Sequence, residues 1–304
     1  MARRGNGFRA AGAAMRALIT GGAGLLGGTL LATASAGVEV HATMRRTPVR
    51  GAPAHALDLA DEDAVRALLR DVRPDVVIHT AYSTENPERN IVAATGCVAR
   101  ACAAVGAALI HVSTDLVHDG EHSPYADDAV PAPVELYGRA KAAAEAEVRA
   151  ALPDAAIART SLIVRADPPD AITARLVATL RSGGTASLYV DELRCPIAAD
   201  DLARQLWEIA ALPAAEARGA WNLVGPEAIT RFALGTLIAR RFGLDASLLR
   251  PARNADHPSP RPRDLRLLTG RADRTLRARA RPITEVLIGT GGSRAGPASP
   301  ASAE

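Results

Sequence analysis

The chain has 304 residues, of which 48% are hydrophobic and 23% are charged, so it can bury an apolar core and is unlike a disordered or fibrous protein. The formal net charge of +3 is small. Arginines gather between Arg250 and Arg281, but no aromatic side chain follows Phe242 to stack on bases. We therefore expect no nucleic-acid partner.

The cysteines and the apolar segments indicate the compartment. Cys97, Cys102 and Cys195 lack the spacing of a disulfide framework or of a Cys-x-x-Cys motif, which is typical of reduced thiols. Glycines interrupt the apolar stretch after Met15, and the sequence contains no apolar run of membrane-spanning length. We therefore expect a cytoplasmic protein without a membrane segment.

From Arg16 onward, short β-rich apolar runs alternate with longer segments of helical period, a pattern typical of βαβ units. It predicts strands at 16–20, 38–43, 54–58, 76–80, 108–113 and 156–160. It predicts helices at 25–35, 62–70, 90–105 and 137–151. With right-handed crossovers, these elements make a Rossmann-like, doubly wound parallel sheet of the α/β class.

The pattern loosens after Thr160. The sequence predicts a helix at 171–181, a strand at 187–190 and helices at 201–211 and 231–242, followed by a segment rich in Pro and Arg. We expect residues 166–288 to form mainly a small C-terminal substrate-binding subdomain at the carboxyl edge of an NAD(P)-binding core, residues 15–165. The low-complexity ends, 1–14 and 289–304, are expected to be disordered.

The first predicted strand runs into a glycine-rich loop that opens a helix. Gly21 allows a tight turn, Gly24 lets the backbone approach a pyrophosphate, and Gly27 permits close packing of the helix on the strand. The phosphates would lie at the positive end of the helix dipole. The order strand, loop, helix, strand favours a dinucleotide site over a purely structural turn. The expected cofactor contacts are Gly21, Gly24, Leu25, Leu26 and Gly27.

The end of the second strand indicates which dinucleotide binds. An NAD enzyme carries a carboxylate there for the adenosine ribose, whereas this chain has Arg45 and Arg46. Guanidinium groups suit a 2′-phosphate, so we expect NADP(H) in preference to NAD(H). The alternative is that both arginines only solvate a loop. Asp58 and Leu59, at the end of the third strand, are candidates for the adenine pocket.

Among 36 lysines and arginines, Lys141 is the only lysine, and it follows Tyr137 by four residues. Residues four apart share one face of a helix, so the phenol and the ammonium can address one substrate. A compact ammonium can reach ribose hydroxyls and lower the pKa of a neighbouring phenol, which a broad guanidinium does less well. The alternative is an ordinary surface pair, but the glycine loop upstream favours a shared site.

The glycine loop and the Tyr137-x-x-x-Lys141 motif together resemble the extended short-chain dehydrogenase/reductase family. The run S-T-D-L-V-H-D-G from Ser113 and the proline-led approach to Tyr137 resemble its dTDP-4-dehydrorhamnose reductase subfamily. The resemblance spans about residues 15–288. It implies NADPH-dependent reduction of a keto group on a nucleotide-linked sugar, with Tyr137 as general acid, by a homodimer.

The resemblance also assigns roles to residues. Lys141 would hold the nicotinamide ribose and tune Tyr137, while Thr114 would hydrogen-bond the substrate carbonyl. Ser113 lies on the opposite face of the strand, so only one of these two hydroxyls can serve. Further cofactor contacts are expected from Thr80, Ala81, Tyr82, Tyr137 and Lys141. Substrate contacts are expected from Tyr82, Thr114, Asp115 and Arg263.

Three positions depart from the family pattern. His79-Thr80-Ala81 replaces an Asn-Ala-Ala-like run, and His118 replaces a phenylalanine. In the next helix an asparagine often supports the lysine, but Ile91 holds that register here, with Asn90 one position off. These departures leave the predicted redox residues in place and make the identity of the substrate an open question.

Other functions remain open at this point. An epimerase or a dehydratase of the same family would use the same tyrosine and lysine, and a dehydratase often adds an acidic residue beside the hydroxyl residue, as Asp115 follows Thr114 here. The methionine adenosyltransferase β subunit, a regulatory partner, resembles the same subfamily. A metal site at Asp115, His118, Asp119 and His122 is disfavoured because Gly120 and Pro124 predict a loop, so we expect no metal.

Overall fold

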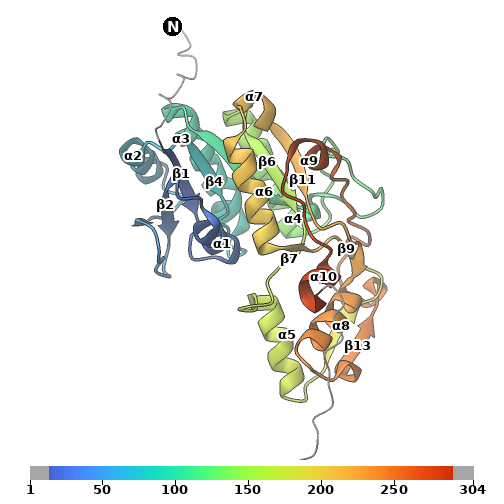
Figure 1. The fold of residues 1–304 in the computed structure, drawn as a ribbon. Coiled ribbons are helices and arrows are strands. Elements are labelled where there is room, and N and C mark those ends of the chain that lie inside the picture. Colours follow the sequence, from blue (N-terminus) through green and yellow to red (C-terminus); the bar gives the residue numbers. More distant parts are fainter. Residues whose placement is uncertain (1–13, 290–304) are drawn as a thin grey trace, which may run out of the picture.

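The computed structural model describes residues 14–289, and its centre is a seven-stranded parallel sheet (Figure 1). The strand order is β11-β6-β5-β4-β1-β2-β3, and each neighbouring pair is parallel. Strands β4 and β6 are buried along their whole length, including the polar residues His79, Arg159 and Thr160 at their carboxyl ends, as expected for central strands covered on both faces. The strands are β1 Met15–Thr20, β2 Val38–Met44, β3 Ala54–Ala56, β4 Val76–His79, β5 Ala108–Thr114, β6 Ala156–Thr160 and β11 Gly219–Leu223.

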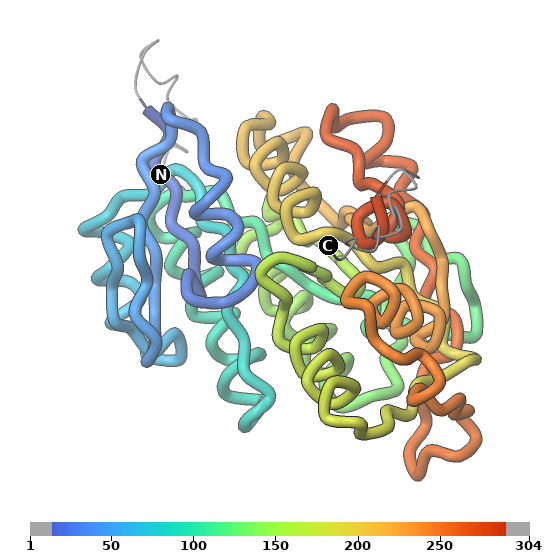
Figure 2. Tube along the Cα trace, turned by 60° about the horizontal axis from the view of Figure 1, so that its bottom comes forward, coloured from blue at the N-terminus to red at the C-terminus, as the bar shows by residue number. Residues whose placement is uncertain are grey.

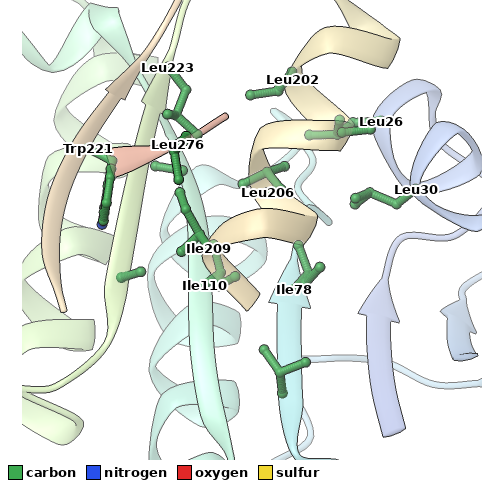
Figure 3. Close-up of a cluster of buried hydrophobic side chains, with 14 of the residues drawn as sticks. Leu26, Leu30, Ile78, Ile110, Leu202, Leu206, Ile209, Trp221, Leu223 and Leu276 are labelled. Atoms are coloured by element: carbon green, nitrogen blue, oxygen red, sulfur yellow. The ribbon is translucent and has the colours of Figure 1, made fainter. Parts of the chain in front are cut away.

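Helices cover both faces of the sheet. On one face lie α1 (Leu25–Thr33) and α6 (Ala199–Ala211), and on the other lie α2 (Glu62–Val72), α3 (Ala94–Val105) and α4 (Leu136–Ala151). Figure 3 shows side chains of α6 packed between α1, the sheet and β11. The predicted Rossmann-like, doubly wound α/β fold is therefore confirmed.

Local sequence explains these helices. In α2, Asp61 caps the first turn by accepting a hydrogen bond from the Ala64 N–H at 3.1 Å. The buried residues Val65, Leu69 and Val72 follow at helical spacing, so one stripe of α2 faces the sheet. The six strands expected from the sequence are present within one or two residues of the predicted bounds.

Two elements of the C-terminal half return to the sheet. The sequence predicted no strand at β11, yet β11 pairs with β6 and extends the sheet by one strand. Helix α6 was expected within the substrate-binding portion, but its Leu202, Leu206 and Ile209 join the main core. The sheet layer is thus built from segments on both sides of residue 165.

Most of the remaining C-terminal elements pack beside the carboxyl edge of the sheet, where Figures 1 and 2 show α5 and α8 next to each other. They enclose a small core of their own that includes Val177, Leu234, Ile238 and Ile283. Short strands pair as β7 with β10, β9 with β12 and β8 with β13. These elements are β7 Ile163–Val164, α5 Ala171–Arg181, β8 Ala186–Tyr189, β9 Leu193–Arg194, β10 Ile197–Ala198, β12 Ile229–Thr230, α8 Arg231–Arg241, β13 Leu249–Ala252 and α10 Ile283–Ile288. Helices α7 (Ala214–Ala217) and α9 (Gly270–Thr275) lie at the opposite end of the sheet, beside the start of β11 (Figure 1).

One predicted helix is divided in two. The segment Glu88–Ala93 is a π-helix, and α3 continues from Ala94. A π-helical turn holds one residue more than an α-helical turn and so shifts the side-chain register. As a result, Asn90 lies on the wall of the main cavity, whereas Ile91 is buried among Ala140 and Ala144 of α4.

The chain ends lie beyond what the structure describes. The expected extension and tail, 1–14 and 289–304, fall outside the described residues except for their innermost positions. Within residues 14–289, no helix is both long and apolar enough to cross a bilayer.

Candidate active site

The glycine loop is a tight turn at the carboxyl end of β1. Gly21 has φ +73°, a conformation that favours glycine, and the Gly24 N–H donates to the Gly21 carbonyl at 2.9 Å. A Cβ on Gly27 would lie 2.2 Å from the Gly21 oxygen. The loop therefore closes only because Gly27 lets α1 begin directly against it.

The loop also touches the neighbouring strand β4. The Thr20 Oγ1 accepts hydrogen bonds from the Thr80 N–H at 3.1 Å and the Ala81 N–H at 3.2 Å. A Cβ on Gly21 would lie 3.0 Å from the Ala81 Cα. Because strand order reverses between β1 and β4, this contact lies at the topological switch point, where open α/β sheets bind ligands.

The start of α1 fits a dinucleotide pyrophosphate. Its N-cap, Gly24, supplies no side-chain hydrogen bond, and its first turn contains no acidic residue. The first N–H groups of a helix lack intrahelical acceptors and carry the positive end of the dipole. The backbone at Leu25 and Leu26, which line the cavity, can therefore receive phosphate oxygens.

The end of the site where we expect the adenosine carries both positively and negatively charged side chains. Arg45 lines the cavity and is exposed, whereas Arg46 is exposed and lies off the cavity wall. Asp58 and Leu59 also line the cavity. The Arg89 guanidinium donates to the Asp58 carboxylate at 2.8 Å and, with the Ala60 N–H, lowers the Asp58 pKa.

A single cavity of about 770 Å³ joins the glycine loop to the predicted catalytic residues. Its wall contains most of the residues expected from the sequence. These are Gly21, Gly24, Leu25, Leu26, Gly27, Arg45, Asp58, Leu59, Thr80, Ala81, Tyr82, Thr114, Tyr137 and Lys141. The cavity thus runs along the sheet edge from the end of β2 past the glycine loop to Tyr137 and Lys141.

Tyr137 lies in the first turn of α4 and is placed by its neighbour Gly138. A Cβ on Gly138 would lie 2.1 Å from the Leu116 oxygen, so only glycine lets α4 approach the loop after β5 this closely. The Tyr82 ring lies 5.6 Å from the Tyr137 ring, centroid to centroid. Tyr82 is 59% exposed and so stands at the mouth of the cavity.

The electrostatics of Tyr137 differ from the expectation that the lysine lowers the phenol pKa. Burial raises the Tyr137 pKa above its usual value, Tyr82 and Asp115 raise it further, and Arg194 lowers it. The phenol is therefore protonated at neutral pH and can donate a hydrogen bond or a proton.

Lys141 is almost fully buried one turn further along α4. Its Nζ donates to the Val112 carbonyl at 2.6 Å and lies 3.3 Å from the His111 Nε2. Burial lowers the Lys141 pKa to about 8, against the opposing charge of Glu145. The ammonium is held against β5 by these two contacts while its side chain also lines the cavity.

The hydroxyl residues at the end of β5 are divided as strand alternation predicts. The Ser113 hydroxyl donates to the Glu145 Oε1 at 2.6 Å, whereas the Thr114 hydroxyl donates to the Asp115 Oδ1 at 3.2 Å. Ser113 is thus bound on the α4 side of the sheet. Ser113 and Thr114 both line the cavity together with Tyr137, but the Thr114 hydroxyl is not bound by Glu145, which is consistent with the role assigned to it.

Two residues expected to contact substrate lie away from the cavity wall. Asp115 is fully buried and bound to Arg194. Arg263 is exposed and pairs with Glu121 at 2.7 Å.

The cavity wall also contains residues that the sequence analysis did not identify. Arg194 lines the cavity, but no local motif marks it among the many arginines. Thr160 and Ser161, also on the wall, have buried hydroxyl oxygens without a hydrogen-bond partner in the described part of the chain.

The disfavoured metal residues serve other contacts. The His122 Nδ1 lies 2.7 Å from the Asp119 carboxylate, and the His118 ring stacks on Tyr125 with centroids 4.1 Å apart. Burial lowers the His118 pKa to about 4, so its imidazole is neutral. Across residues 14–289, no group of three or more His, Cys, Asp and Glu side chains is placed to hold a metal ion.

Comparison with known proteins agrees with this geometry. A dTDP-4-dehydrorhamnose reductase from Mycolicibacterium smegmatis is 33% identical over 262 residues, covering 82% of this chain and 76% of the relative. A methionine adenosyltransferase 2 subunit beta from Pongo abelii is 32% identical over 229 residues, covering 69% of this chain and 68% of the relative.

The comparison of structures gives the same result. A hypothetical dTDP-4-dehydrorhamnose reductase from Sulfolobus tokodaii superposes with a TM-score of 0.76 at 28% identity, covering 88% of this chain and 97% of that one. The family model of the RmlD substrate binding domain matches residues 15–288. The chain therefore belongs to the RmlD substrate binding domain family, in agreement with its resemblance to the extended short-chain dehydrogenase/reductases.

Proposed function

We propose that this protein is an NADPH-dependent reductase that reduces a keto group on a nucleotide-linked sugar. One observation carries the proposal: a single cavity connects an open helix N-terminus at the glycine loop with Thr114, Tyr137 and Lys141. A phosphate-binding end and a proton-donating end in one cavity suit transfer of a hydride from a dinucleotide to a carbonyl.

The roles of the residues follow from their environments. NADPH bound at the loop would supply a hydride to the carbonyl carbon. Tyr137, whose phenol is protonated at neutral pH, donates its proton to the carbonyl oxygen as negative charge develops there. The Thr114 hydroxyl hydrogen-bonds the same oxygen. Lys141, whose Nζ is fixed by the Val112 carbonyl, would hold the cofactor ribose through a hydrogen bond from its ammonium.

Cofactor preference rests on Arg45. Its guanidinium lies on the cavity wall at the end of β2, where it can pair with a 2′-phosphate. Arg46 lies off this wall, so the preference depends on one arginine instead of the two expected from the sequence. NADPH is expected to support faster turnover than NADH at equal, subsaturating concentrations, and NADH is the second choice.

The nature of the substrate is inferred from relatives. The Mycolicibacterium smegmatis relative is named for reduction of dTDP-4-dehydrorhamnose, which makes this compound the first substrate to test. A nucleotide-linked sugar is long enough to need the part of the cavity beyond Tyr137, where Leu162, Ile172 and Arg194 form the wall.

Two alternatives are weighed against the structure. A dehydratase would need an acidic residue beside Thr114, but Asp115 is fully buried and bound to Arg194 by two hydrogen bonds, which argues against proton transfer to a substrate. A regulatory role is supported by relatives named methionine adenosyltransferase 2 subunit beta. Such a subunit would bind NADPH and leave keto sugars unchanged.

The deciding experiment mixes purified protein with NADPH and dTDP-4-dehydrorhamnose and follows the loss of NADPH absorbance together with the reduced sugar by mass spectrometry. We expect turnover by the wild type and a loss of kcat/KM by about a thousandfold in Tyr137→Phe, because the proton donor is removed. NADPH affinity should stay within about threefold, since the phenol hydroxyl contributes little to cofactor binding.

Binding of NADPH without turnover on this and related keto sugars would instead support the regulatory alternative. The homodimer expected from the resemblance stays a prediction, and sedimentation of the same protein sample tests it.

A further inference from the structure

A buried ion pair lies beside the catalytic residues. The Arg194 Nε donates to the Asp115 Oδ2 at 2.8 Å, and the Nη2 donates to the Oδ1 at 2.6 Å. Asp115 has no exposed surface, and Arg194 is 4% exposed. This bidentate geometry gives both oxygens of the carboxylate a hydrogen bond and holds the guanidinium in one orientation.

The pair connects two distant parts of the chain. Asp115 directly follows β5, whereas Arg194 lies on β9 in the C-terminal half. The Arg194 Nη1 also donates to Glu192 at 3.3 Å, and Arg261 forms ion pairs with Glu192 at 2.9 Å and with Glu135 at 3.3 Å. Glu135 immediately precedes α4, so a continuous row of ion pairs runs from the end of β5 to the helix that carries Tyr137.

The two partners occupy different positions at the cavity. Arg194 is part of the wall, whereas Asp115 lies behind it. The Thr114 hydroxyl donates to the Asp115 Oδ1 at 3.2 Å, a long hydrogen bond to an oxygen that Arg194 already occupies. A buried carboxylate without this arginine would be an uncompensated charge and a stronger acceptor for the Thr114 hydroxyl.

We propose that Arg194 is a positioning residue for carbonyl reduction: by compensating the charge of Asp115, it weakens the hydrogen bond from the Thr114 hydroxyl to that carboxylate, so that the hydroxyl can turn to the substrate oxygen beside the Tyr137 phenol. This inference rests on the proposed function. When the hydride adds to the carbonyl carbon, the carbonyl π electrons move to the oxygen, which then takes the phenol proton. An unpaired carboxylate next to Thr114 would oppose that developing negative charge.

The effects of Asp115 and Arg194 on the Tyr137 pKa agree with this role. Asp115 raises the Tyr137 pKa and Arg194 lowers it, so the two partners act in opposite directions on the proton donor. Loss of the arginine alone would leave only the unfavourable influence, making the phenol a weaker acid. Loss of both charges would remove both influences together.

The test is a double-mutant cycle on the full chain with NADPH and dTDP-4-dehydrorhamnose. In Arg194→Gln we expect kcat to fall about a hundredfold, comparable to loss of an oxyanion donor, while KM for the sugar and Kd for NADPH change less than about threefold. The second substitution Asp115→Asn in the Arg194→Gln background should recover about tenfold in kcat, because the uncompensated carboxylate is gone.

A matched pair of controls separates this role from general stabilisation. Arg281 bonds the fully buried carboxylate of Asp201 at 3.1 Å, and neither residue lines the cavity. Arg281→Gln and the double variant Asp201→Asn/Arg281→Gln should therefore keep kcat within about twofold of the wild type, whatever they cost in stability.

If Arg194→Gln does not fold, the comparison of the two variants that carry Asp115→Asn still tests the inference. Once Asp115 is neutral, Arg194 should matter little, so Asp115→Asn and Asp115→Asn/Arg194→Gln should differ in kcat by less than about threefold. A large difference between these two variants, or wild-type kcat in a folded Arg194→Gln, would overturn the inference while leaving the reductase intact. A wild type that binds NADPH but reduces no keto sugar would overturn the proposed function, and this inference with it.

Discussion

At the scale of single residues, the chain's one lysine is in an unfavourable place for a charge. Lys141 is 3% exposed, and burial lowers its pKa to about 8 from its usual value of 10.5. The Val112 carbonyl and the neutral His111 ring offset part of this cost. Active sites commonly retain such groups at the expense of stability, and Lys141 fits that pattern.

The lowered pKa of Lys141 predicts that the stability of the wild type, relative to that of Lys141→Met, changes with pH. Below about pH 8 the lysine is protonated in both the folded and unfolded states. Between about pH 8 and 10.5 the unfolded chain binds more protons, so wild-type stability rises with pH by up to about 3 kcal/mol relative to the variant. Urea unfolding of both proteins across this range measures the difference, and parallel stability curves would contradict the buried, shifted ammonium.

At the scale of elements, α1 and its glycine loop form one unit. Gly21 turns the chain, Gly24 begins the helix, and Gly27 lies against the Gly21 carbonyl with no room for a Cβ. Gly28 is one position further along the same helix, and a Cβ there would have its nearest neighbour, the Gly22 oxygen, at 3.6 Å. Packing therefore requires glycine at Gly27 but leaves room for a Cβ at Gly28.

These two glycines supply a matched pair of substitutions. In Gly27→Ala the new Cβ would collide with backbone, so the loop and α1 must move apart and NADPH affinity should fall by about a hundredfold. Gly28→Ala makes only an ordinary contact and should keep affinity while gaining up to about 1 kcal/mol of helix propensity. Fluorescence titration with NADPH and thermal unfolding compare them. Equal losses of affinity in both variants would mean that helix flexibility, not loop closure, forms the phosphate site.

The elements also show what the sequence could predict. Periodicity located the strands before residue 160 and their helices, because each segment carries its own apolar pattern. The π-helical segment Glu88–Ala93 was missed since its extra residue depends on tertiary packing and leaves no pattern in the sequence. Strand β11 was missed because Gly219 and Ala220 lower its strand propensity, which pairing with β6 overrides.

The residues of the candidate site likewise include some that the sequence could predict and some that it could not. Motifs found Gly21, Thr114, Tyr137 and Lys141, which the structure brings to one cavity, because each lies in a local pattern with a known geometry. Arg194 could not be found by this route. Its partner Asp115 is 79 positions away, and only the fold makes them neighbours.

At the scale of the whole molecule, the two halves of the chain share one core. The largest buried cluster combines Leu30 of α1 and Ile78 of β4 with Leu206 of α6 and Trp221 of β11 (Figure 3). The Trp221 ring is further covered by the Arg271 guanidinium, 3.7 Å from the ring centroid. The expected division into a cofactor-binding and a substrate-binding portion is therefore not a division into two separate cores.

Shared packing predicts that the cofactor-binding portion depends on the rest of the chain. A fragment of residues 14–165 would lack Leu202, Leu206, Ile209, Trp221 and Leu223, which are all at most 1% exposed. Burial of five such side chains is worth roughly 10 kcal/mol, as much as the entire stability of a typical domain. We expect the fragment to show no cooperative urea transition and no NADPH binding, whereas residues 14–289 should show both.

The comparison uses circular dichroism and NADPH fluorescence on the two purified polypeptides. A fragment that unfolds cooperatively and binds NADPH would mean that the strands up to β6 suffice, with α6 and β11 only covering a finished sheet. If the shared core is required, adding residues 166–223 to the fragment should restore the cooperative transition, because this segment supplies α6 and pairs β11 with β6.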